Sequence, residues 1–312
     1  MATARTYLFM RALGLCLAIS VWTVSALAGS SAAIGGPVAG FVFDAASGAV
    51  RPMLGIPGAA HLGDSVVSKL ETAFIAPDGS AVLAVAAGRL ILFSNLRGVS
   101  PAAAPVGGIL GGVDAVAWSP DATAAAISSA RHSRVQLLTG IPQTPSVSAP
   151  VDLWTLPGPL TVLACDGRNI LIGVPGGIYI AGPGGVPKRI AQAASPVAIA
   201  LAGADLYFAD NETQQVWHVA NYAGKVSSEL FAYGNAVDSP AGLQLSSSGQ
   251  QLYVANAGNR TVAIYDVGSQ SLLDTLVLPV TPTRLDRFGA SSVFLLNSTG
   301  SVIAKLAVTV GG

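Results

Sequence analysis

Polar residues that could bind a ligand or a metal ion stand near the ends of apolar, strand-like segments. They are Arg131, His132, Asp210, Asn211, Asn256, Asn259 and Asn297, and the longer connections add His61, Asp64, Asp114 and Asp238. Carboxylate and amide oxygens suit Ca²⁺, and Asp210, Asn256 and Asn297 could begin such a set. A complete calcium site needs about six to eight oxygens, ideally from several carboxylates, and no Glu stands at an equivalent position. The residues therefore predict a ligand-binding face and leave metal binding open.

Catalytic chemistry has less support in the sequence than binding. No H-x-x-E-H, G-x-S-x-G or EF-hand pattern is present. A chain without a complete acid–base, nucleophile or metal set is better interpreted as a binding protein than as an enzyme, and no cofactor is predicted. Asp and Asn side chains also cap tight turns, which is the alternative interpretation of each candidate.

A repeated unit of short strands must position these residues. Apolar strands from Ala73 onward end in turns near Asp78, Asp121, Asp166, Gly203, Gly249 and Gly289, at intervals of about 40 residues. Each turn is followed by a second apolar strand, by a third strand rich in β-branched and aromatic residues, and by a more polar fourth strand. Long stretches with the apolar periodicity of a helix are absent. This spacing predicts an all-β fold, a β-propeller of four-stranded blades, with six blades favoured and seven possible.

The segment from Phe41 to Leu54 is predicted to be a hairpin with a glycine turn. It looks like the third and fourth strands of a blade without its first two, while the last repeat, from Thr283 to Val308, has no clear fourth strand. Pairing of these ends would close residues 39–312 into a single ring and remove open strand edges. Seven blades result if the hairpin belongs to a separate partial blade. In either ring, the loops between second and third strands and the loops between blades share the face that carries the candidate residues.

Two segments resemble a known repeat family. Residues 252–266, Leu-Tyr-Val-Ala-Asn-Ala-Gly-Asn-Arg-Thr-Val-Ala-Ile-Tyr-Asp, look like the YVTN-type propeller repeat, and residues 206–219 are similar to both that repeat and the NHL repeat. The resemblance implies a ring with a binding face. Relatives include surface-layer proteins, interaction scaffolds, lactonases and quinone-dependent dehydrogenases, so it implies little about the ligand. The enzyme alternative is a propeller hydrolase of lactonase type with a Ca²⁺-dependent central site.

The N-terminus has the pattern of an export signal. Arg5 and Arg11 precede the uncharged apolar run from Ala12 to Val24, and Ala26-Leu-Ala28 has the form that signal peptidases cleave. Residues 1–28 are therefore predicted to be a signal peptide and residues 29–38 a short linker, which places the mature protein outside the cell or in a periplasm. Cleavage also removes Cys16 and leaves Cys165, predicted to be a buried structural residue.

Composition limits the partners of the mature chain. Removing Arg5 and Arg11 from 16 basic residues leaves 14 against 16 acidic residues, a net charge near −2. Nucleic-acid binding is excluded as a function class because the chain has no basic patch to neutralise phosphates. Charged residues make up only 10% of the chain and the mean hydropathy is +0.59, so small and apolar residues must cover much of the surface. The predicted function is binding or assembly with a protein or small-molecule ligand, with no membrane span after signal cleavage.

Overall fold

The computed structural model describes residues 37–56, 59–288, 293–298 and 303–307, the last two ranges by their backbone. The predicted signal peptide and most of the predicted linker lie outside the described residues. No helix in the part of the chain that the structure describes is long and apolar enough to cross a membrane.

The described strands form seven antiparallel sheets. The first contains β1 (Val38–Asp44), β2 (Ala49–Leu54) and β3 (His61–Leu62), and the second β4 (Thr72–Ile75), β5 (Ala81–Ala86), β6 (Arg89–Ser94) and β7 (Ala102–Pro105). The third contains β8 (Ala115–Trp118), β9 (Ala125–Ser129) and β10 (Arg134–Thr139), whose outer neighbour is split into β11 (Ser146–Val147) and β12 (Val151–Asp152). The fourth contains β13 (Val162–Cys165), β14 (Ile170–Val174), β15 (Gly177–Ala181) and β16 (Lys188–Ala191).

The last three sheets follow in the same order. The fifth contains β17 (Pro196–Ala202), β18 (Asp205–Asp210), β19 (Gln215–Ala220) and β20 (Ser227–Tyr233), and the sixth β21 (Pro240–Leu245), β22 (Gln251–Asn256), β23 (Thr261–Asp266) and β24 (Leu272–Val277). The seventh contains β25 (Pro282–Arg287), β26 (Val293–Ser298) and β27 (Ile303–Ala307). Helical structure in the described residues is limited to the short 3₁₀ turns η1 (Ala130–His132) and η2 (Gly234–Ala236).

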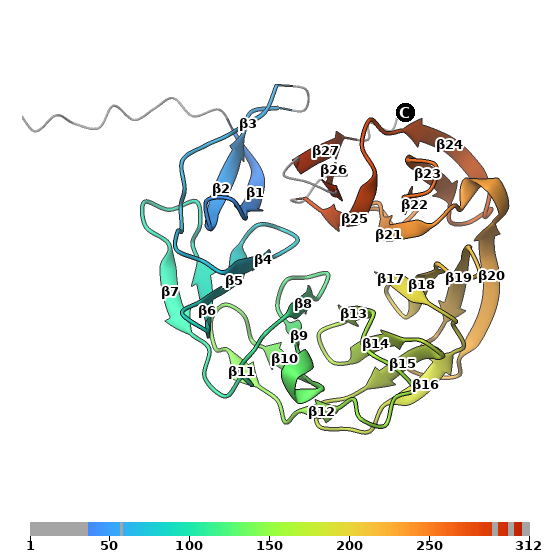
Figure 1. Ribbon diagram of the computed structural model, residues 1–312, viewed down its shortest axis with the longest axis horizontal. Helices are drawn as coiled ribbons and strands as arrows, with labels where there is room; N and C mark the ends of the chain where they lie inside the picture. Colours follow the sequence, from blue (N-terminus) through green and yellow to red (C-terminus); the bar gives the residue numbers. More distant parts are fainter. Residues whose placement is uncertain (1–36, 57–58, 289–292, 299–302, 308–312) are drawn as a thin grey trace, which may run out of the picture. The chain divides into compact units, whose positions relative to one another are not determined.

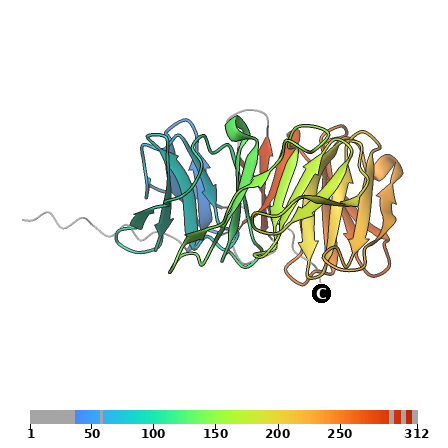
Figure 2. The ribbon, with the colours of Figure 1, turned by 90° about the horizontal axis from the view of Figure 1, so that it is seen from below.

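The seven sheets stand around a common centre, each with its first strand innermost (Figure 1). Seen from the side, the sheets stand upright next to one another (Figure 2). Apolar side chains fill each junction between neighbours; for example, Leu83 of β5 and Ile127 of β9 belong to one buried cluster. This arrangement is a β-propeller and confirms the predicted fold class.

Turn chemistry explains why the strands end where they do. The carboxylates of Asp78, Asp121 and Asp166 accept hydrogen bonds from the backbone N–H two residues later, at 2.7 to 3.1 Å. Such bonds fix tight turns, and the sequence predicted turns at these positions. Three first strands begin with a proline, Pro196, Pro240 or Pro282, and the strand register shifts immediately after each one. The first strand β1 begins with Val38 and has the same shift, so the bulge is shared by these strands, and proline is tolerated there because it has no N–H to donate to the ladder.

The N-terminal hairpin occupies a different position from the one predicted. Its first strand, β1, lines the central cavity through Phe41 and Phe43, and β3 pairs outside β2. The hairpin therefore supplies the first and second strands of its own sheet, not the third and fourth of another. A short hairpin has the same local pattern in either position, and only its packing distinguishes them. The seven sheets match the alternative in which the hairpin belongs to a separate blade.

Side chains from both ends of the described ring meet at the last junction. Val42 and Met53 form a buried cluster with Phe288, which directly follows β25. The approach is close, because a Cβ atom on Gly40 would lie 2.6 Å from the Phe288 ring. Among the described strands, β1–β3 and β25–β27 remain separate sheets, so the contact seen here is made by side chains and not by a shared ladder. Backbone pairing of the two chain ends stays a prediction.

Candidate functional site

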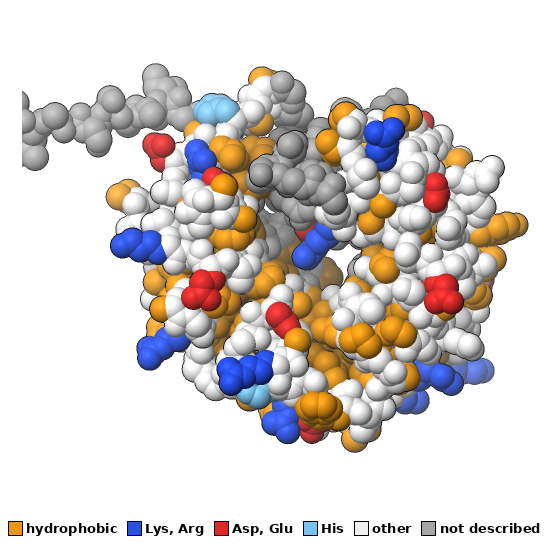
Figure 3. Space-filling view, in the orientation of Figure 1, with side chains coloured by type: hydrophobic (Ala, Val, Ile, Leu, Met, Phe, Trp, Pro, Cys, Tyr) orange, Lys and Arg blue, Asp and Glu red, His pale blue; other side chains and the backbone are white. Residues whose placement is uncertain are grey.

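A cavity of about 660 Å³ lies at the centre of the ring. Residues of the seven first strands line it, and most of them are apolar: the side chains of Phe74, Val116, Leu163, Ile199 and Leu243 form much of the wall. Figure 3 shows the ring hollowed at its centre, with hydrophobic side chains on the visible wall. Val116 and Leu243 also belong to buried clusters between neighbouring sheets, so the same first strands supply both the junction cores and the cavity wall.

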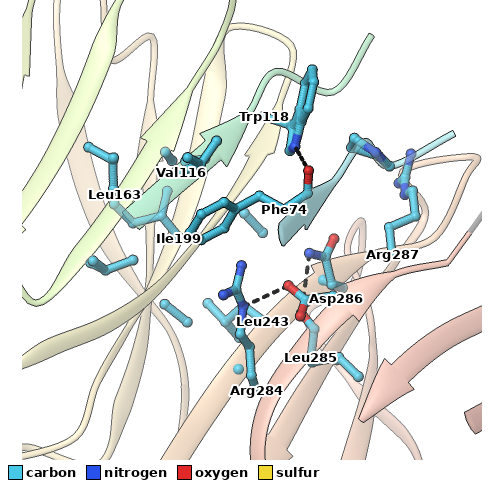
Figure 4. Close-up of a pocket in the computed structure, with 18 of the residues that line it drawn as sticks. Phe74, Val116, Trp118, Leu163, Ile199, Leu243, Arg284, Leu285, Asp286 and Arg287 are labelled. Carbon is cyan, nitrogen blue, oxygen red and sulfur yellow. Dashed lines mark hydrogen bonds and ion pairs between the residues drawn. The ribbon is translucent and has the colours of Figure 1, made fainter. Parts of the chain in front are cut away.

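Polar groups gather on one wall, formed by β21 and β25. Arg284 Nε donates to Asp286 Oδ1 at 2.7 Å (Figure 4). Gln244 Nε2 donates to the carbonyl oxygen of Leu285 at 3.3 Å. Arg287 Nη2 donates to the carbonyl oxygens of Leu245 and Ser246, at 3.1 and 3.4 Å. We call Arg284, Asp286 and Arg287 the charged wall.

Two members of the charged wall, Asp286 and Arg287, are partly buried, whereas Arg284 is exposed. Burial raises the pKa of Asp286 above its usual range, although the guanidinium of Arg284 opposes that shift. Burial also lowers the pKa of Arg287. Both shifts disfavour the charged forms, which is the effect of removing water from an ionised group.

Asp210 has a structural role in a loop. It lies at the end of β18, is 1% exposed, and accepts hydrogen bonds from the backbone N–H groups of Ala194, Ser195, Glu212 and Thr213. The first two of these groups belong to the segment that leads into β17. The Asp210 carboxylate thus joins the loop between β18 and β19 to the connection that enters β17 from the preceding blade. The neighbouring Asn211 is exposed.

Asn256 performs the same task in the next sheet. It is fully buried at the end of β22, accepts from the Asp238 backbone N–H at 3.1 Å and donates to the Ala236 carbonyl oxygen at 3.0 Å. The exposed Asn259 donates to the Asn235 carbonyl oxygen at 3.3 Å and accepts from Thr261 Oγ1 at 2.6 Å. Asn256, Asn259 and Asp238 therefore lie together, and their recorded bonds stay within the two loops.

A third loop pair brings together Asp114, Arg131 and His132. Asp114 Oδ2 accepts from the backbone N–H of Ala130 at 2.8 Å, and Arg131 and His132 follow in η1. His132 Nδ1 lies 2.8 Å from Ser129 Oγ. Ser129 is buried, and its hydroxyl donates to the Gly111 carbonyl oxygen at 2.7 Å. This hydroxyl therefore stabilises the loop that contains Gly111 and is not exposed to a substrate.

The remaining candidates are dispersed. His61 is exposed on β3 and Asp64 is exposed just after it. Asn297 lies in β26 opposite Arg284, and its side chain is outside the described part of the structure. Within the described residues, no three His, Cys, Asp or Glu side chains come together as metal ligands would. The structure therefore gathers the predicted residues into three loop pairs and does not bring them into one pocket.

Sequence reasoning missed the charged wall. Its signal is the segment Thr283-Arg-Leu-Asp-Arg287, where charges alternate with Leu285 along a first strand that should be apolar. That strand opens the last predicted repeat, which begins at Thr283. An alternating charged segment there would have pointed to the cavity.

Cys165 is buried, as predicted. It is 0% exposed at the end of β13, its Sγ accepts from the backbone N–H of Gly167 at 3.3 Å, and burial raises its pKa to about 12. In a Cys16→Ser variant of the full chain, we expect a maleimide reagent to leave the native protein unlabelled and to react stoichiometrically after denaturation, because the thiolate is the reactive form. Mass spectrometry of both states measures the labelling. Rapid stoichiometric reaction of the native protein would contradict a buried structural role.

The fold and the central cavity define a β-propeller, and comparison with solved structures agrees. The chain is similar to the β-propeller domain of Cps50 (Swd1) from Myceliophteria thermophila, with 13% identity and a TM-score of 0.60 over 88% of this chain and 98% of that one. A nidogen/laminin complex also matches, with 13% identity and a TM-score of 0.49 over 76% of this chain and 92% of that one. No protein-family model and no curated protein matches the sequence. At 13% identity the first similarity shows the fold alone.

Proposed function

We propose that this protein is an exported propeller of the YVTN/NHL type that binds a ligand in its central cavity. Export is supported by the charged start, the apolar run and the Ala26-Leu-Ala28 pattern, and the repeat type by residues 206–219 and 252–266. These two segments form β18 to β19 and β22 to β23, the middle strands of adjacent blades.

The observation that carries this proposal is a central cavity lined mostly by apolar residues, with charged and polar side chains on one wall. A volume of about 660 Å³ suits a small organic molecule or the end of a partner's side chain or loop. Binding sites of this kind are mainly apolar and have a few polar groups that orient the ligand. Gln244 and the charged wall supply such groups on one side.

The hydrolase alternative finds less support in the geometry. A calcium site needs oxygens that are free to turn toward the ion, whereas both Asp210 oxygens accept backbone N–H groups. Asn256 is likewise held by the loop around Asp238. Binding is therefore the function that we propose.

A cavity-filling substitution tests the proposal. Ala117 lines the cavity on β8, so Ala117→Trp should lower the affinity for the neutral dye Nile red at least about tenfold by occupying the space. Ala103→Trp on the exposed outer strand β7 is the matched control and should bind like the wild type. Dye fluorescence measures binding, and thermal unfolding checks that both variants fold. Equal affinity of Ala117→Trp and the wild type would overturn the cavity as the binding site.

A further inference from the structure

The charges that line the cavity are unevenly distributed. Of the described residues in its wall, the charged ones are Asp114 on the side of β8 and the charged wall, Arg284, Asp286 and Arg287, on β25. Asp114 already accepts a backbone hydrogen bond from Ala130. On β25, two guanidinium groups stand against one carboxylate, so this side of the cavity has an excess of one positive charge.

Arg284 is the member of the charged wall best placed to meet a ligand. Its side chain is 58% exposed, and Figure 4 shows it pointing into the cavity. Among the described residues its recorded hydrogen bond uses Nε, toward Asp286, which leaves the Nη1 and Nη2 end of the guanidinium directed away from that partner. Arg287, by contrast, uses Nη2 to hold two carbonyl oxygens of the neighbouring blade.

The guanidinium group favours one ligand chemistry. Its planar fork of N–H donors matches the two oxygens of a carboxylate, and such charge-assisted bonds are stronger than neutral ones. The bond to Asp286 fixes the plane of the Arg284 group, so less side-chain freedom is lost when a ligand binds.

The rest of the cavity favours an apolar ligand body. Phe74, Val116, Leu163 and Ile199 come from four consecutive first strands and present no charged group. The Trp118 ring nitrogen, which could have been a donor to a ligand, donates to the Phe74 carbonyl oxygen at 3.1 Å (Figure 4). A ligand that fills this space must therefore bury hydrocarbon or aromatic surface there.

We propose that the cavity binds a small amphipathic carboxylate, with the carboxylate on the Arg284 guanidinium and the apolar body against Phe74, Val116, Leu163 and Ile199. This proposal rests on the proposed function, since it specifies the ligand class of the same cavity. Asp286 acts as a positioning residue that holds Arg284 through Nε. A peptide C-terminus with an apolar last residue and a free medium-chain acid share this chemistry.

The test uses the full chain and three probes with the same ten-carbon tail: decanoate, decanol and decyltrimethylammonium. Each displaces Nile red from the protein at pH 7.5. We expect decanoate to bind at least about tenfold more tightly than decanol, because a charge-assisted bond adds to burial of the tail. We expect the cationic probe to be the weakest. Arg284→Gln should bring decanoate to the affinity of decanol or below it, and decanol itself should bind as to the wild type.

Controls separate this inference from the proposed function. Arg168→Gln removes one exposed arginine from a turn outside the cavity and should retain the preference for decanoate. If Ala117→Trp leaves dye binding intact, the cavity is not the site and the proposed function fails. If the dye does bind in the cavity but decanoate and decanol displace it with equal affinity, or if Arg284→Gln leaves the ratio of their affinities unchanged, the carboxylate proposal alone is overturned. A peptide ending in Leu, compared with its C-terminal amide, then distinguishes a protein terminus from a free acid.

Discussion

Deleting residues 39–56 should abolish the cooperative unfolding transition of the protein. The deletion removes β1 and β2, including the buried side chains of Phe41, Val42, Val50 and Met53. Each fully buried side chain of this kind contributes about 1.5–3 kcal/mol, so their combined loss is comparable to the whole stability of a typical domain. The deletion also exposes Val82 and Phe288, which pack against the hairpin from its two sides. Circular dichroism during thermal and urea unfolding measures the effect.

Two point variants test the contribution of the first sheet to stability with smaller changes than the deletion. Val50 is 0% exposed and packs against the second sheet, so Val50→Ala should lower the free energy of unfolding by about 1–2 kcal/mol. Val99 is fully exposed, and Val99→Ala should leave stability unchanged within about 0.5 kcal/mol. A deletion variant that unfolds at the wild-type temperature would show that the ring does not depend on its first sheet.

Asp210→Ala should lower the free energy of unfolding by about 3 kcal/mol. The substitution leaves two loop segments without the acceptor of four backbone hydrogen bonds, in a position where the carboxylate is 1% exposed. Urea unfolding followed by tryptophan fluorescence measures the change. Because the loop lies outside the cavity wall, the folded variant should still bind Nile red with wild-type affinity.

Asp64→Ala is the control for this variant, since Asp64 is an exposed aspartate in the connection that follows β3. Its stability should remain within about 0.5 kcal/mol of the wild type. If Asp210→Ala changes stability no more than Asp64→Ala does, the loop role is wrong. Asp210 would then again be a candidate residue of the predicted ligand-binding face.

Local sequence patterns were sufficient to predict the repeated strands and their turns. Asp78, Asp121 and Asp166 terminate strands through bonds to residues only two positions away, so their role follows from chemistry close in sequence. Burial of Cys165 could be predicted for a similar reason, because it ends a short apolar strand in front of such a turn. The buried Asp210 and Asn256 fit the turn-capping alternative, although their partners also include the loop from the preceding blade.

The position of the hairpin could not be decided in this way. Phe41 and Phe43 alternate with other apolar residues in a pattern that suits an inner or an outer strand equally well. Their place at the cavity follows from packing against β4 and Phe288, which lie about 30 and 245 residues further along the chain. The number of sheets depends on the same contacts, so the sequence alone leaves six or seven blades open.

The sequence by itself determined the all-β repeat, the turn residues and the balance of charge, because each depends on residue types within one strand or one turn. Only the tertiary structure decided which side chains of the first strands reach the shared centre. That choice converts Arg284, Asp286 and Arg287 from ordinary strand residues into a charged wall, since seven first strands meet around a single cavity. It also separates Asp210 and Asn256 into different loop pairs, because each is bound by the connection that enters its own blade. A cavity formed by residues from every blade has no local signature in the chain.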